Sequence, residues 1–300
     1  MALITVYTPT FNREKLLPRV YNSLLNQTKK DFIWQIIDDG SSDGTKALVE
    51  KWIKEAPFEI RYFYKENGGI HTARDAAYRI CDTELIFGVD SDDWLVDDAI
   101  EKIEDYWQRY GNDNVVGIFA KCQYEDGTII SSEFPPEIVK ATYQEFKYKY
   151  KIGGDLVNVF NNKFMVKTLD APVFPGEKLV GEDYKTIQLP DVPLLMLPEP
   201  LMIKEYQTDG YTADVYNCMF NNPNGFREDY RQHIIHAKYL KPLIRGYIGY
   251  ISCCILLKDG KLFKDVPSKA VMALMLPIGV LGYIGLLYRR NKANKSRIKE

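Results

Sequence analysis

The chain has 300 residues, 46% of them hydrophobic and 13% aromatic, so it can bury a sizeable core in one large domain or in a catalytic domain with an appendage. Its formal net charge is −2, which excludes the strongly basic field of a typical nucleic-acid-binding protein. The five cysteines form no CxxC pair and no zinc-finger spacing with histidine. We interpret them as reduced thiols of a cytoplasmic protein.

In the first half of the chain, short apolar, β-branched runs alternate with amphipathic stretches. The predicted strands cover residues 4–7, 33–37, 60–64 and 85–89. The predicted helices cover residues 16–25, 47–53 and 72–80. This alternation is typical of βαβ units around a largely parallel sheet. Because the N-terminus lacks a basic segment followed by a long apolar stretch, we expect it to begin with a strand and not with a secretory signal.

The second half of the chain has less regular patterns. We expect a helix over 96–110, a strand over 115–122 and a polar, aromatic stretch near 143–150. A strand pair at 194–197 and 201–206 is followed by predicted helices over 226–239 and 243–257.

Polar clusters follow three of the predicted strands, and ligands bind outside the carboxyl ends of strands in open parallel sheets. The clusters are residues 8–13, 38–45 and 90–93. The last contains Asp90, Asp92 and Asp93, which repel one another unless a cation lies between them. Oxygen ligands suit Mg²⁺ or Mn²⁺, held by one or two carboxylates and by substrate phosphates.

Three other kinds of motif also contain closely spaced aspartates. A solvated turn that caps the next helix would also use aspartates. An EF-hand is excluded because Leu95 replaces the glycine that its loop needs at the sixth position. A phosphatase of the haloacid dehalogenase type also carries an Asp-x-Asp pair at a strand end, and it remains an alternative enzyme.

Two further motifs lie in the same half of the chain. Asp38 and Asp39 precede a Gly-Ser-Ser-Asp-Gly turn, and a carboxylate at that strand end can accept the N–H of a pyrimidine ring. Farther on, Asn67-Gly68-Gly69 precedes a predicted helix that carries the cation Arg74.

Taken in order, these motifs resemble those of family 2 glycosyltransferases of the GT-A fold. The resemblance covers about the first 110 residues closely, and Gly181-Glu182-Asp183 extends it. It implies an α/β, Rossmann-like mixed sheet, mostly parallel, flanked by helices and followed by C-terminal helices. We expect a catalytic domain over 1–220, with a nucleotide-sugar-binding half over 1–110 and an acceptor half over 111–220, and a helical, membrane-associating region over 221–300.

The resemblance also implies roles for single residues. Asp92 would hold Mn²⁺ or Mg²⁺. Asp183 would be the general base that deprotonates the acceptor hydroxyl, with Glu182 as the alternative base. The residues implied in binding the nucleotide sugar are Thr8, Pro9, Asp38, Asp39, Arg74, Asp90 and Ser91. No histidine pairs with the cysteines at a zinc-site spacing, and we expect His233 and His236 to lie on a surface helix.

Residues 270–288 contain no charged side chain, and a basic tail follows them. The run is long enough to cross a bilayer. However, a single crossing would carry the basic tail away from the cytoplasm, where nucleotide sugars are found, and Pro277 with three glycines is expected to break or kink a helix. We therefore expect a bent segment within 265–300 that lies in the membrane interface. A buried helix or a homodimer contact is the alternative.

The leading hypothesis is an inverting hexosyltransferase that uses a UDP-sugar and acts at the cytoplasmic face of a bacterial membrane. Its acceptor would be a glycan or a lipid-linked molecule in surface polysaccharide synthesis. A competing hypothesis of another class is a non-catalytic subunit that binds nucleotide sugars within a polysaccharide assembly complex.

Overall fold

The computed structural model describes residues 2–205, 215–258 and 260–297. The chain divides into two compact units, each made of two segments. The first unit comprises Met1–Leu169 and Leu189–Tyr206, and the second comprises Asp170–Gln188 and Gln207–Glu300. The functional division expected at residue 220 stays a prediction.

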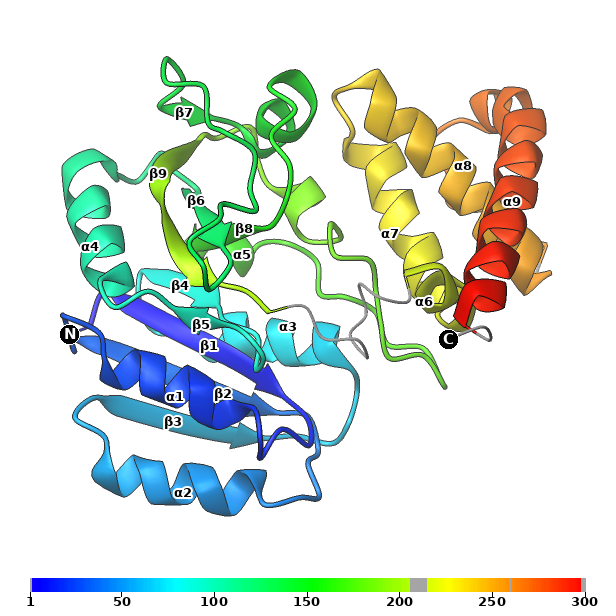
Figure 1. Ribbon diagram of the computed structural model, residues 1–300. Helices are drawn as coiled ribbons and strands as arrows, with labels where there is room; N and C mark the ends of the chain where they lie inside the picture. Colours follow the sequence, from blue (N-terminus) through cyan, green and yellow to red (C-terminus); the bar gives the residue numbers. More distant parts are fainter. Residues whose placement is uncertain (1, 206–214, 259, 298–300) are drawn as a thin grey trace. The chain divides into compact units, whose positions relative to one another are not determined.

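The first unit is built on a mixed sheet (Figure 1). Within the described residues its strand order is β3-β2-β1-β4-β8-β6-β9-β5, with β7 beside β9. The first four strands are parallel to one another, β8 runs antiparallel to β4 and β6, and β6 is parallel to β9. The strands are β1 (Ile4–Thr10), β2 (Phe32–Asp38), β3 (Glu59–Tyr64), β4 (Leu85–Gly88), β5 (Trp94–Leu95), β6 (Gly117–Gln123), β7 (Lys140–Ala141), β8 (Leu156–Asn161) and β9 (Leu194–Ile203).

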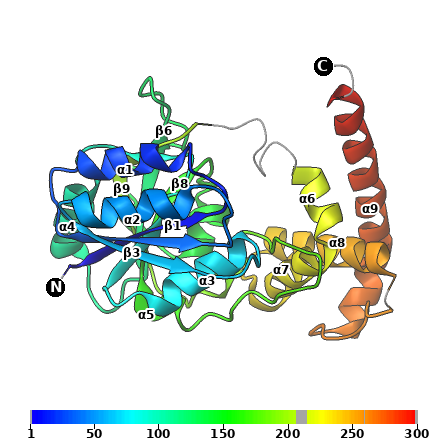
Figure 2. The ribbon, with the colours of Figure 1, turned by 90° about the horizontal axis from the view of Figure 1, so that it is seen from below.

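Helices cover both faces of this sheet (Figure 2). On one face, α1 (Leu17–Leu25), α2 (Thr45–Glu55) and α4 (Ala99–Tyr110) contribute to the larger hydrophobic cluster. On the other face, α3 (Ile70–Ile80) and α5 (Asn162–Met165) contribute to the second. Both β1 and β2 are buried along their whole length. The sequence of β2 is a nearly continuous apolar run, as is common in parallel strands that are covered on both faces.

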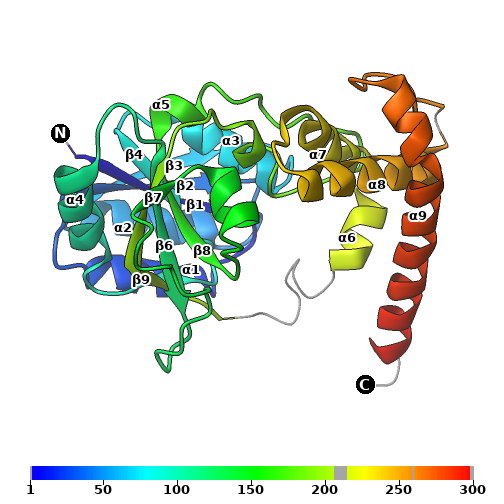
Figure 3. The same ribbon diagram turned by 90° about the horizontal axis from the view of Figure 1, so that it is seen from above.

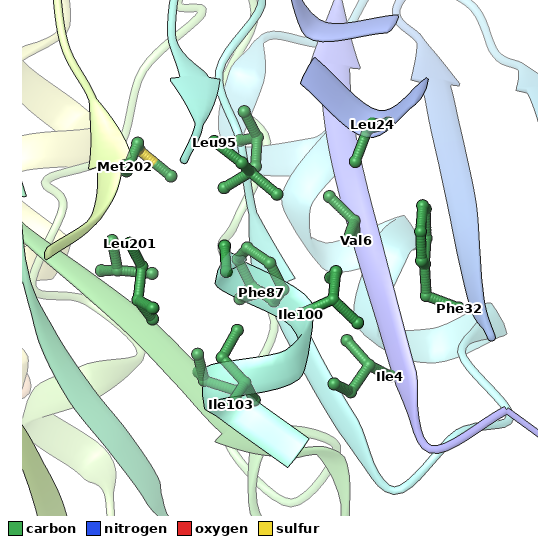
Figure 4. Close-up of a cluster of buried hydrophobic side chains, with 14 of the residues drawn as sticks. Ile4, Val6, Leu24, Phe32, Phe87, Leu95, Ile100, Ile103, Leu201 and Met202 are labelled. Atoms are coloured by element: carbon green, nitrogen blue, oxygen red, sulfur yellow. The ribbon is translucent and has the colours of Figure 1, made fainter. Parts of the chain in front are cut away.

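The larger cluster joins α1 and α4 to the sheet (Figure 4). Ile4 and Val6 of β1 meet Leu24 of α1 and Ile100 of α4, and all four side chains are at most 1% exposed. A fully buried aliphatic side chain contributes about 1.5–3 kcal/mol. This packing fixes the direction of β1 and so the place where its polar C-terminal end emerges.

The predicted βαβ alternation is confirmed, and the second half of the unit differs from expectation in detail. The expected strand pair is one strand, β9, because the chain continues through Pro198 and Pro200 with a register irregularity against β6. Residue 206 of the expected pair lies outside the described residues. The polar, aromatic stretch contains a π-helix, η1 (Glu145–Lys149).

The second unit is helical (Figure 3). It has its own hydrophobic cluster. Its elements are η2 (Thr186–Gln188), α6 (Val215–Asn221), α7 (Pro223–His236), α8 (Leu240–Leu257) and α9 (Lys269–Arg297). Glycines let these helices approach closely, since a Cβ on Gly279 would lie 2.5 Å from Ile251. The sequence predicts that Pro277 breaks or kinks the helix; the break is wrong, because α9 continues through this proline as one helix, and the kink stays a prediction.

Candidate active site

The loops after β1 and β2 are tied together by side chains. Asn12, at φ 53°, donates its backbone N–H to Ser41 Oγ at 2.8 Å, and its Oδ1 accepts the N–H of Ser42 at 2.8 Å. Asparagine tolerates this left-handed conformation better than most residues. Asp38 is fully buried and accepts the N–H of Ser41 at 2.7 Å and the Tyr62 hydroxyl at 2.5 Å. Asp38 therefore shapes the turn.

Asp39 lies beside Asp38 and organises the loop that leads into α3. Its carboxylate accepts the backbone N–H groups of Gly68 and Gly69 at 2.9 and 2.7 Å and pairs with Lys65. Gly69 has φ 97°, a conformation that favours glycine. The Asn67-Gly68-Gly69 motif is thus held to the end of β2. Lys65 is not among the residues that the sequence motifs indicated, although its place directly after β3 is a signal for it.

Thr8 and Pro9 lie at the end of β1 and are buried. The Thr8 hydroxyl accepts the indole N–H of Trp34 at 3.0 Å, and Trp34 is fully buried. This hydroxyl is therefore bonded within the core. Pro9 pairs in register with Ile37 of β2.

The three aspartates of the acidic run lie in different surroundings. Asp90 is 40% exposed, and its Oδ1 lies 3.5 Å from Arg74 Nη2 of α3. Burial raises the pKa of the Asp92 carboxyl, and the nearby Asp90 carboxylate raises it further. Ser91, between them, is buried. The structure thus brings Arg74, Asp90 and Asp92 to the same edge of the sheet.

Asp93 is buried and forms an ion pair with Lys204, with 2.7 Å between Oδ2 and Nζ. Burial works to lower the pKa of Lys204, but the carboxylates of Asp93 and Asp90 outweigh it and raise that pKa. Lys204 follows β9, far from Asp93 in the sequence, so no local pattern could have identified it. The pair removes one of the three carboxylates from the set that could bind a cation.

Asp90 and Asp92 remain as oxygen donors for a metal. Among the residues that the structure describes, no group of three or more His, Cys, Asp and Glu side chains gathers to hold an ion. The mutual repulsion of Asp90 and Asp92, seen in the raised pKa of Asp92, fits a divalent cation. Mg²⁺ and similar ions are often bound by one or two carboxylates together with substrate phosphates.

The Glu182-Asp183 pair belongs to the second unit. Glu182 is exposed, whereas the Asp183 side chain is 17% exposed. The pair lies in a turn that leads into the short 3-10 helix η2. The backbone carbonyl of Asp183 accepts the N–H of Ile187, which lies within η2. Asp183 Oδ2 lies 3.8 Å from His233 Nε2.

The expectation of a surface position is wrong for His233, which is 1% exposed on α7. His236, three residues later, is half-buried. The spacing of apolar residues along α7 could not predict which of the two histidines is buried. The face of α7 that packs inward depends on α8 and on the Glu182-Asp183 segment.

The family model of glycosyl transferase family 2 matches residues 5–168. TarP of Staphylococcus aureus, a poly(ribitol-phosphate) beta-N-acetylglucosaminyltransferase, is 24% identical over 266 residues, which cover 82% of this chain and 80% of TarP. Chondroitin synthase of Escherichia coli is 36% identical over 107 residues, which cover 36% of this chain. The chain spans 16% of that synthase and 21% of the glycosyltransferase GlyA of Streptococcus pneumoniae.

Solved structures share the fold. The crystal structure of S. aureus TarS residues 1–349 matches with a TM-score of 0.57 and 15% identity, covering 100% of this chain and 92% of that one. A mannosyltransferase from Pyrobaculum calidifontis, in complex with GDP-Man and Mn²⁺, matches with a TM-score of 0.54 and 16% identity, covering 97% of this chain and 84% of that one.

Proposed function

Because the chain belongs to glycosyl transferase family 2 and has the GT-A fold, we propose that it is a glycosyltransferase that moves a sugar from a UDP-sugar to a hydroxyl group with inversion. The proposed acceptor is a glycan or a lipid-linked molecule in bacterial surface polysaccharide synthesis. The observation that carries the proposal is the divided acidic run, in which Lys204 neutralises Asp93 while Asp90 and Asp92 remain available beside Arg74.

Two relatives support the choice of donor and acceptor. TarP is by name a transferase of N-acetylglucosamine to a poly(ribitol-phosphate). A TarS crystal structure that shares this fold holds UDP-GlcNAc. Because the chain belongs to this family, the alternative of a phosphatase of the haloacid dehalogenase type is excluded.

In the proposed donor site, Pro9, Asp39 and Arg74 contact the nucleoside, and Asp90 with Ser91 orients the ribose or the sugar. Asp38 acts through the turn that it shapes. Thr8 contributes through the backbone at the end of β1, because its hydroxyl is bonded to Trp34.

Asp92, helped by Asp90, would hold Mn²⁺ or Mg²⁺. When bound, such an ion stabilises the negative charge that develops on the departing diphosphate. Arg74 is placed 3.5 Å from Asp90 and adds a further positive charge at the same edge.

Asp183 is the proposed general base. It takes the proton of the acceptor hydroxyl while that oxygen bonds to the anomeric carbon. The bond from this carbon to the diphosphate oxygen breaks, and its electron pair leaves with the nucleotide. Glu182 is the alternative base, but its exposed side chain is less shielded from water than that of Asp183.

A donor screen tests this function. UDP-GlcNAc, other UDP-sugars and GDP-mannose are mixed with Mn²⁺ or Mg²⁺, and nucleotide release is measured. We expect release from a UDP-sugar, lowered at least about 100-fold in Asp92→Ala and Asp183→Asn, since a general base alone contributes about 10²–10⁴-fold. Unchanged release in both variants would contradict the mechanism, and nucleotide binding without release in the wild type would favour the non-catalytic subunit.

Helix α9 supports a membrane-surface location. Leu274, Leu281 and Tyr288 recur every seven residues and are 75%, 68% and 70% exposed, so they form one apolar stripe along the helix. Within the part of the chain that the structure describes, α8 and α9 are long and apolar enough to cross a membrane, and α9 is the less buried of the two. Exposed basic residues follow the stripe, among them Arg289 and Lys292. We propose that α9 lies on anionic lipid at the cytoplasmic face.

Flotation with vesicles of phosphatidylglycerol and phosphatidylcholine tests this location. Leu274→Ser with Leu281→Ser should lower binding at least about 10-fold, given the apolar area removed from lipid. Both positions are exposed, so the buried Met272 and Met275 keep α9 in its cluster. Leu240→Ser, at an exposed leucine of α8, is the control. If the double variant floated with the vesicles as the wild type does, the proposal would be contradicted. If the wild type were a dimer in solution and the double variant a monomer, the homodimer contact would be favoured instead.

A further inference from the structure

A buried histidine in the second unit faces two carboxylates. His233 Nε2 lies 3.8 Å from Asp183 Oδ2 and 3.9 Å from Asp229 Oδ2. The His233 side chain is 1% exposed and that of Asp229 is 8% exposed. Histidine changes charge near neutral pH, and charges at this separation interact strongly away from bulk water.

Helix spacing and a glycine bring Asp183, Asp229 and His233 together. Asp229 precedes His233 by one turn of α7, so both side chains lie on the same helix face. A Cβ on Gly181 would lie only 2.3 Å from Asp229 Oδ2. Glycine at this position therefore lets the segment that carries Asp183 come against the Asp229 carboxylate.

The segment before Asp183 is also fixed to the N-terminus of α7. Glu177 is buried and accepts the backbone N–H of Gly225 at 2.8 Å. The Asn222 side chain accepts the N–H of Lys178 at 2.8 Å. A carboxylate at a helix N-terminus satisfies unpaired N–H groups and the helix dipole. Helix α7 is thus the support on which Asp183 is held.

We propose that His233 is a positioning residue for the base Asp183 and that its imidazolium keeps Asp183 ionised beside Asp229. Two neighbouring carboxylates disfavour each other's ionisation, and a protonated Asp183 could not accept a proton. A cation between them offsets that repulsion. Gly246 of α8 lies against His233, because an added Cβ there would be 3.0 Å from the His233 Cβ. The inference rests on the proposed function of Asp183.

The first test compares His233→Gln with His236→Gln, the same change three residues later on α7. Glutamine keeps a hydrogen-bond donor but loses the positive charge. For nucleotide release from UDP-GlcNAc with Mn²⁺, we expect the acid limb of the pH profile of His233→Gln to move to higher pH. Its kcat at pH 6 should fall about 10-fold or more with the donor KM unchanged. An acid limb that stays where His236→Gln and the wild type have it would overturn the inference.

The second test does not depend on activity. The ring nitrogens of His233 are titrated by NMR in the wild type, in Asp183→Asn and in Asp229→Asn, which conserve side-chain shape. Loss of either carboxylate should lower the measured pKa of His233 by about one pH unit or more, while His236 changes little. Unchanged titration of His233 overturns the inference whatever the activity. A wild type that releases no nucleotide from any donor overturns the proposed function instead.

Discussion

The two compact units hold their acidic residues by different means. In the first unit the carboxylates follow strands of the sheet, and Asp93 pairs there with Lys204. In the second unit Asp183 lies in a turn and is supported from α7 by His233. The carboxyl ends of neighbouring parallel strands lie at one edge of the sheet, so residues that follow them come together. A residue in a turn has no such framework, and other side chains must hold it in place.

This difference separates stability from activity. In the Lys204–Asp93 pair the carboxylate is buried and the lysine side chain is 20% exposed, so breaking the pair should affect folding first. The His233–Asp183 contact is longer than a hydrogen bond and acts through charge, so altering it should affect the reaction first. The following variants test this separation.

Lys204→Met should have the largest effect, and it should appear in stability. The variant leaves the Asp93 carboxylate buried without its cation, which costs about 3 kcal/mol in the free energy of unfolding. Urea unfolding at pH 7.5 measures this loss. Because burial raises the pKa of Asp93, the folded state binds its proton more readily than the unfolded state does. The loss should therefore shrink as the pH falls.

Lys102→Met is the matched control, because Lys102 pairs with Asp98 at 2.8 Å on the partly exposed surface of α4. Its cost should stay below about 0.5 kcal/mol. Adding Asp93→Asn to Lys204→Met should recover most of the loss. Equal stability of the two methionine variants would contradict the view that the first unit depends on its buried pair.

Gly181→Ala should have a smaller effect, and it should appear in activity. The new Cβ would lie 2.3 Å from Asp229 Oδ2 and 2.8 Å from Asp229 Cβ, so the whole Asp229 side chain must shift. We expect nucleotide release to fall about 10-fold, which corresponds to about 1.4 kcal/mol, with a smaller loss of Tm than a clash with backbone would cause. Gly153→Ala is the control, since its nearest neighbour, Ser132 Oγ, is 4.0 Å from the added Cβ.

Gly225→Ala tests, within the same unit, a clash with backbone instead of a clash with a side chain. Its Cβ would lie 2.2 Å from the backbone oxygen of Leu179, which cannot move without the chain, so this variant should lose stability. If Gly181→Ala lost stability while keeping its full rate, the supporting role of Asp229 would be wrong.

The sequence revealed the first unit better than the second for a physical reason. Alternating strands and helices, and polar residues after each strand, predicted the sheet and the edge where Arg74, Asp90 and Asp92 lie. These signals are local. Lys204 and His233 come from distant segments, and their partners depend on how strands and helices pack. No periodicity within α7 distinguishes the buried His233 from its half-buried neighbour His236.

Thr8→Val should have the smallest effect, and it tests whether a strand-end motif serves the fold or the ligand. Valine keeps the shape of threonine but removes the hydroxyl that accepts the Trp34 N–H. A buried donor left without its acceptor costs about 1 kcal/mol, measured by urea unfolding. We expect the affinity for UDP-GlcNAc to change less than about twofold, because that hydroxyl belongs to the core. Thr5→Val, on the same strand, breaks the bond to Thr83 and should show the same pattern. If Thr8→Val lowered the affinity for the donor and Thr5→Val did not, the Thr8 hydroxyl would be assigned to nucleotide binding.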